Sequence, residues 1–213
     1  MSQWLDTVLV AALALNFCAL GVSRIRAVIS AVAAQGVVLA CCPLLVHAHL
    51  DLRALALVAV WVLVKGVVLP HLLVRAMREA DIRHEVKPVV GYPASLFLGA
   101  VGTVLAMLFS SGLPLAEGHA ESLVVPASLA TVWAGFLLLT TRKKAIMQVL
   151  GYLVLENGIF LFGLLLLEAL PFLVEVGILL DLFTGVFVMG ITIFHINREF
   201  SSISTEHLTG LKE

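Results

Sequence analysis

Residues 148–194 read QVLGYLVLENGIFLFGLLLLEALPFLVEVGILLDLFTGVFVMGITIF, two long apolar runs that each carry an acid near the middle. Glu156 lies in the first run and Asp181 in the second. Apolar runs of about 20 residues are long enough to cross a bilayer as helices. A carboxylate at the bilayer centre costs about 2.5 kcal/mol or more. The stretch therefore predicts two membrane-spanning helices whose acids have a role beyond anchoring.

The composition indicates a membrane protein throughout. The mean hydropathy is +1.10, and only 13% of the 213 residues are charged, against about 25% in a soluble domain. Cys18, Cys41 and Cys42 lie within apolar runs without metal-ligand spacing, and we expect them to be packing residues. The sequence contains no nucleotide-binding loop or catalytic triad. We therefore expect no metal, no cofactor and no catalytic site on this chain.

Seven apolar segments predict an all-α integral membrane bundle of seven transmembrane helices. Backbone polar groups in hydrocarbon must be satisfied within each segment, which favours helices. The predicted spans are residues 4–22, 27–46, 54–74, 89–110, 122–141, 145–167 and 171–194. We divide the chain into a three-helix half (1–88), a fourth helix with an outer loop (89–121), a three-helix unit (122–200) and a tail (201–213). The start, MSQWLDTVLV, lacks the basic region of a signal peptide and predicts a retained first span.

The basic residues gather in connections that alternate onto one side of the membrane. These are Arg24, Arg26, Arg75, Arg78, Arg83, Lys87, Arg142, Lys143, Lys144, Arg198 and Lys212. The other side holds only Arg53, so the positive-inside rule predicts an outer N-terminus and a cytoplasmic C-terminus. The longest connection on the basic side, residues 75–88, is either a solvated face or a docking surface for a peripheral partner.

Three ionisable residues on different spans fall at similar depths. At about 1.5 Å per residue, Lys65, Glu156 and Asp181 each lie about 15–18 Å from an end of their span, near the middle of a core about 30 Å thick. Glu175 is shallower, about one turn inside the outer boundary. In one interpretation Lys65 pairs with one acid and the cluster only holds helices together. In the other, the acid without an internal partner is shifted toward its neutral form by desolvation and handles protons.

Other polar residues bear on this midplane cluster. Pro70 lacks the amide that would bond the Gly66 carbonyl, which predicts a local break beside Lys65 where water could enter. Interhelical hydrogen bonds are expected of Asn16, Gln35 and Gln148. His71 and His195 lie near the cytoplasmic ends of spans three and seven and are candidates for proton entry.

Two segments resemble a known family. QVLGYLVLENGIFLFGLLL and PFLVEVGILLDLFTGVFVMGITIFHINREF are similar to component E of hydrogenase-4 complexes, the formate hydrogenlyase relatives. The last three spans are in turn similar to the K subunit of complex I and the C subunit of multi-subunit Na+/H+ antiporters. The K subunit carries a proton-path Glu in each of its last two spans. Asp181 matches the final one, with Gly185 four residues on, whereas Glu156 sits one turn later relative to Gly151. Lys65 falls in the N-terminal half, which the K subunit lacks.

The resemblance implies a membrane-arm subunit of a hydrogenase-4 or complex I-like oxidoreductase in a prokaryotic inner membrane. Nickel–iron and iron–sulfur centres would lie on peripheral hydrogenase subunits, antiporter-like subunits would lie beside this chain, and no nucleic acid is expected as a partner. The predicted proton path comprises Glu156, Asp181, Lys65 and Glu175. The alternatives are a structural connector between antiporter-like subunits and the redox module, and a subunit of a cation/proton antiporter.

Overall fold

The computed structural model describes residues 3–46, 52–79, 88–113, 123–164 and 190. Within these ranges the chain is helical, without strands, and six segments are long and apolar enough to cross a membrane. They are Trp4–Gly21, Ile25–Leu45, Val58–Arg78, Tyr92–Ser111, Val124–Thr141 and Ala145–Gly163. Over the described residues the all-α prediction is confirmed, and each of the first six predicted spans contains a helix long and apolar enough to cross a membrane. The predicted seventh span, with Glu175 and Asp181, lies outside the described residues.

The spans are built from nine labelled elements within the described ranges. They are α1 (Gln3–Gly21), α2 (Ile25–Ala40), α3 (Cys42–Val46), α4 (Leu52–Leu63), the π-helical segment η1 (Val64–Val68), α5 (Leu69–Glu79), α6 (Tyr92–Ser111), α7 (Val124–Thr141) and α8 (Ala145–Gly163). The second span is interrupted at Cys41, two residues before Pro43. Pro43 has no amide hydrogen and therefore cannot donate the next helical hydrogen bond of α2. The third span runs through α4, η1 and α5 without interruption.

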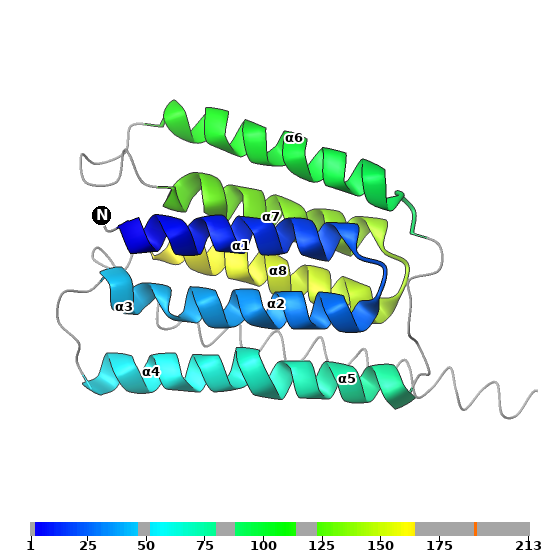
Figure 1. Cartoon of the computed structure of the whole chain (residues 1–213), viewed down its shortest axis with the longest axis horizontal. Helices are drawn as coiled ribbons and strands as arrows, with labels where there is room; N and C mark the ends of the chain where they lie inside the picture. The colour runs from blue at the N-terminus through cyan, green and yellow to red at the C-terminus, as the bar shows by residue number, and fades with distance from the viewer. Residues whose placement is uncertain (1–2, 47–51, 80–87, 114–122, 165–189, 191–213) are drawn as a thin grey trace, which may run out of the picture.

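The helices lie side by side along one direction (Figure 1). The antiparallel pair α7–α8 forms the most extensive contact, α1 packs on α2 and α7, and α2 packs on α8. The helix α6 covers α7 and α1 on one flank. On the other flank, the α4–η1–α5 span lies against α2, and α5 also contacts α8. The centre of the described bundle is therefore made by α1, α2, α7 and α8.

One end of the bundle carries most of its positive charge, and we call it the basic end. The α1–α2 connection, the end of α5 and the α7–α8 connection meet there (Figure 1). Its basic residues are Arg24, Arg26, Arg75, Arg78, Arg142, Lys143 and Lys144. The predicted gathering of these connections on one side is thus seen in the fold.

Two separate hydrophobic clusters fill the bundle. The cluster nearer the basic end includes Leu20, Ile25, Leu73, Leu138 and Met147. The cluster at the opposite end is made by the start of α1, the end of α2, the start of α7 and the end of α8, and by α3. Polar side chains separate the two clusters, and these form the candidate site.

Candidate functional site at the centre of the bundle

A buried ion pair joins the third and sixth spans. Nζ of Lys65 on η1 lies 3.0 Å from Oε1 of Glu156 on α8, and the two side chains are only 11% and 7% exposed. The same ammonium donates a hydrogen bond to Oδ1 of Asn157 at 2.8 Å. Opposite charges attract strongly where little water screens them. Two of the three predicted midplane groups therefore meet, and Glu156 is the acid that pairs with Lys65.

A distortion of the third span places Lys65 at this position. Residues Val64–Val68 form a π-helical turn, in which the Leu69 amide donates to the Val64 carbonyl five residues earlier. Pro70 is the second residue after this segment, so the irregularity predicted beside Lys65 takes the form of a widened turn in a continuous helix. Such turns inside α-helices occur frequently at functional sites. Gly36 on α2 lets the two spans approach, since a Cβ there would lie 3.0 Å from Cβ of Lys65.

Two aromatic rings adjoin the ion pair on the side away from the basic end. Trp61 lies one turn before Lys65, and Phe160 lies one turn after Glu156 on the antiparallel α8. Their ring centroids are 4.6 Å apart. Nζ of Lys65 lies 5.0 Å from the Trp61 centroid and 5.7 Å from that of Phe160. Both rings stabilise an ammonium through their π faces and cover it with apolar surface.

A row of hydrogen bonds continues from Asn157 across the bundle. Nδ2 of Asn157 donates to Oε1 of Gln35 at 3.3 Å, and Nε2 of Gln35 donates to Oδ1 of Asn16 at 2.7 Å. Nδ2 of Asn16 donates to the Thr131 hydroxyl at 2.9 Å, which donates to the Ala127 carbonyl at 2.7 Å. We call these side chains, with Lys65 and Glu156, the polar row. It crosses η1, α8, α2, α1 and α7.

The donors of the polar row all point the same way. An ammonium can only donate, so Lys65 turns the oxygen of Asn157 toward itself. The Asn157 amide nitrogen then faces Gln35, and that of Gln35 faces Asn16. Gln35 also donates to the Ala12 carbonyl at 3.2 Å. The interhelical hydrogen bonds predicted for Asn16 and Gln35 are confirmed, and they orient the residues that hold the ion pair.

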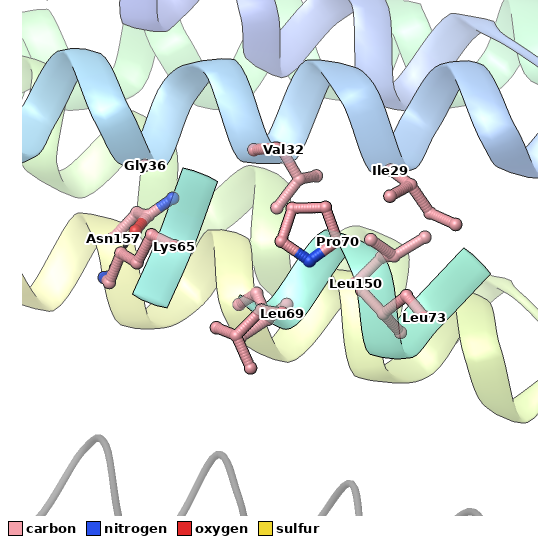
Figure 2. A pocket seen from close by; sticks show the side chains of 11 residues that line it. Ile29, Val32, Gly36, Lys65, Leu69, Pro70, Leu73, Leu150 and Asn157 are labelled. Atoms are coloured by element: carbon pink, nitrogen blue, oxygen red, sulfur yellow. Dashed lines mark hydrogen bonds between the residues drawn. The ribbon is translucent and has the colours of Figure 1, made fainter. Parts of the chain in front are cut away.

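A cavity adjoins Lys65 on its basic-end side. Its volume is about 20 Å³, enough for one water molecule. Figure 2 shows Lys65, Asn157 and Gly36 at one end of this cavity and Ile29, Leu73 and Leu150 at the other. Val32 and Pro70 lie between these ends. Pro70 therefore does more than widen the turn, because it lines the space next to the lysine.

The remaining predicted residues lie elsewhere. His71 is exposed and does not line the cavity. The amide of Gln148 donates to the Arg142 carbonyl at 3.3 Å, so it stabilises the α7–α8 connection and takes no part in the polar row. Asp181, Glu175 and His195 lie outside the described residues, as do Arg83, Lys87, Arg198 and Lys212. Among the residues that the structure describes, no three His, Cys, Asp or Glu side chains lie together in a metal-binding group.

Arg142 is a residue whose role the sequence did not reveal. Its basic-end position was predicted, but its side chain is only 1% exposed. The guanidinium donates to the Leu20 carbonyl at 2.7 Å and the Val90 carbonyl at 3.1 Å, and lies 4.7 Å from the ring centroid of Tyr92. Arg142 therefore ties the end of α1 to the chain entering α6. The sequence signal that could have indicated this buried role is the position of Arg142, directly after the apolar α7 and before Lys143 and Lys144.

The chain as a whole is similar to known proteins. The chain is 34% identical over 191 residues to the uncharacterized protein Rv0085 of Mycobacterium tuberculosis, covering 89% of this chain and 87% of that protein. It is 31% identical over 151 residues to hydrogenase-4 component E of Escherichia coli K12, covering 70% of this chain and 68% of the relative. The component E of Shigella flexneri gives the same values. No family model and no solved structure matches the chain.

Proposed function

The chain belongs to the hydrogenase-4 component E family, and from this premise we propose that it is a membrane-arm subunit of a hydrogenase-like complex in which Lys65 and Glu156 carry redox-coupled protons. The observation that supports this most directly is the 3.0 Å ion pair between two spans. A buried ion pair is a poor way to stabilise a fold, because apolar residues of similar size are often as good or better. Its presence at mid-membrane favours a role in ion transport.

The pair offers a simple proton exchange. Transfer of one proton from the Lys65 ammonium to the Glu156 carboxylate yields a neutral amine and a neutral acid, with total charge unchanged. The amine then accepts a proton from water, and the acid releases its own to another acceptor, for which Asp181 and Glu175 are the candidates. A conformational change in the complex drives this exchange if it alters the relative proton affinities of the two groups.

The remaining parts of the proposal concern the complex around this chain. The chain itself supplies no catalytic group, and the nickel–iron and iron–sulfur centres belong to peripheral partner subunits. Antiporter-like subunits lie beside it in a prokaryotic inner membrane, with the basic end facing the cytoplasm. His71 and His195 are the candidate residues for proton entry at that face.

A double-variant cycle in the assembled complex tests the role of the ion pair. Lys65→Met and Glu156→Gln are each expected to lower redox-driven proton movement at least about tenfold, because either change removes one proton carrier. The combined variant is expected to remain equally inactive, and Asp181→Asn to slow proton movement as well. The measurement is acidification of membrane vesicles, followed with a pH-sensitive dye, with subunit assembly checked on native gels. Leu63→Met, at an exposed position on the same span, is the matched control.

The combined variant separates proton transfer from a structural role. If the pair only holds helices together, each single variant leaves a buried charge without its partner, whereas the combined variant removes both charges and restores function. Full proton movement in the combined variant would contradict the proposal. The chain would then be a structural connector.

A further inference from the structure

The two sides of the Lys65–Glu156 pair differ in what lies next to them. Toward the basic end, Lys65 borders the cavity beside Pro70. Toward the opposite end, Trp61 and Phe160 pack on each other with ring centroids 4.6 Å apart. The hydrophobic cluster beyond them includes Leu39, Leu161 and Phe160 itself. A proton carrier placed between such surroundings has unequal access to the two faces of the membrane.

The cavity lies on the basic-end side of the ion pair, and its polar lining is Lys65 and Asn157, whereas its other walls are mainly apolar side chains of the cluster nearer the basic end. Its lining extends from Lys65 to Leu73, eight residues or about 12 Å along the span. With a volume of about 20 Å³, the cavity itself occupies only the part of the path to the end of α5 that lies next to the ion pair. Because Pro70 has no amide hydrogen, it cannot bond the Gly66 carbonyl, and that carbonyl is a potential acceptor for water beside Lys65. The volume of about 20 Å³ limits occupancy to about one water molecule.

Among the residues that the structure describes, the opposite side of the pair is covered by apolar surface. Nζ of Lys65 lies within 5.7 Å of both aromatic centroids, and Phe160 is only 8% exposed. Trp61 packs against the cluster at this end. Water has no hydrogen-bonding partner on such a surface, so it is not held there.

We propose that, in the conformation described here, the Lys65–Glu156 pair exchanges protons with the basic end alone, through the cavity beside Pro70, while Trp61 and Phe160 block the opposite face. This inference rests on the proposed function for the identity of the carried ion. The asymmetry of water access stands on the geometry of the cavity and the aromatic pair. Conduction across the whole membrane then requires the Trp61–Phe160 contact to open in another conformation.

Thiol accessibility tests the asymmetry without measuring proton movement. In assembled complex with Cys18, Cys41 and Cys42 changed to Ser, single cysteines are introduced as Ala33→Cys on the cavity wall and Leu39→Cys in the opposite cluster. Ag⁺, an ion of about the size of water, is applied to one face of oriented vesicles. Protection of each thiol from later alkylation is read by mass spectrometry. Arg26→Cys, exposed at the basic end, reports which face received the ion.

The expected result is reaction at position 33 from the basic-end face only, and none at position 39 from either face. Reaction at position 33 from the opposite face, or from neither face, would overturn the inference. In a second measurement, Ala33→Leu fills the cavity and is expected to slow redox-driven proton movement at least about fivefold. Ala34→Leu, on the exposed face of the same helix, leaves the rate unchanged. Equal rates in the two variants would also overturn the inference.

The outcomes for the route and for the ion are distinguishable. One-sided silver access together with a fully active Lys65→Met/Glu156→Gln variant means that the cavity is a water route and that the pair does not carry the protons. Loss of proton movement in the pair variants, with two-sided silver access, means that the pair carries protons by a different route.

Discussion

The α7–α8 pair and the α4–η1–α5 span carry the two partners of one ion pair, yet they are packed very differently. In each of α7 and α8, 67% of the span is buried, against 11% for the span from Val58 to Arg78. The residues of η1 are partly buried or exposed, and none is fully buried. Regions with few buried contacts open more readily than the core of a fold. The carboxylate of Glu156 therefore sits on a rigid support, and Lys65 on the part of the site best able to move.

Glycines allow the close packing of α7 against α8. A Cβ on Gly151 would lie 2.6 Å from the backbone nitrogen of Leu139, and one on Gly158 would lie 2.6 Å from that of Val132. Gly135 on α7 makes a still closer approach to the backbone of Leu155. Small residues let membrane helices associate through their backbones, where van der Waals packing is the main attraction. The position of Glu156 is fixed by this contact between α7 and α8.

The largest expected effect comes from a substitution that forces α7 and α8 apart. Gly158→Ala inserts a methyl group against the α7 backbone, which cannot yield as a flexible side chain would. We expect the free energy of unfolding of the full chain in detergent, measured by denaturant titration, to fall by about 3 kcal/mol. Gly163→Ala is the control, because a Cβ there meets nothing within 4 Å. A similar small change in both variants would show that α7 and α8 do not depend on this approach.

Sequence was sufficient for the quantities that depend on position along a single helix. The approximate positions of the first six spans, the shared depth of Lys65 and Glu156, and the irregularity near Pro70 all follow from counting residues from charged residues or prolines along the sequence. Counting alternate connections between successive spans likewise predicted that the basic connections lie on one side. Each of these predictions needs only the helical rise and the local chemistry of one segment.

Contacts between helices could not be predicted by counting residues, because they depend on how each helix is rotated and on which helices are neighbours. Depth alone left two acids as partners for Lys65, and the structure pairs it with Glu156. Asn157 was noted beside Glu156, but its bonds to Lys65 and Gln35 could not be assigned from one chain. The inclusion of Thr131 was likewise missed, since a Thr in an apolar helix commonly bonds its own backbone. The prediction for Asp181 stays a prediction.

A smaller effect is expected from interrupting the polar row at Gln35, which joins α2 to α1 and α8. Gln35→Leu removes the hydrogen bonds that Gln35 makes with Ala12, Asn16 and Asn157. At about 0.6 kcal/mol for each interhelical hydrogen bond in a membrane protein, the free energy of unfolding should fall by about 2 kcal/mol. Gln148→Leu is the matched control, since Gln148 is exposed and, among the described residues, its amide bonds the nearby α7–α8 connection. Equal losses in the two variants would mean that the polar row contributes nothing specific to stability.

The smallest expected effect, and the one that sharpens the comparison most, comes from making the loosely packed span regular. Pro70→Ala restores an amide that can donate to the Gly66 carbonyl, and a typical hydrogen bond contributes about 1 kcal/mol. Backbone amide exchange in Val64–Val68 should then slow about fivefold, as followed by hydrogen–deuterium exchange. Pro93→Ala, at the start of α6 where no helical bond is missing, should leave exchange in its own helix unchanged.

If the π-helical turn holds Lys65 beside Glu156, the same Pro70 variant will also slow proton movement, because a span made more regular turns the ammonium away from the carboxylate. Unchanged exchange with normal proton movement would show that the widened turn is maintained by packing against Gly36 and not by the missing amide.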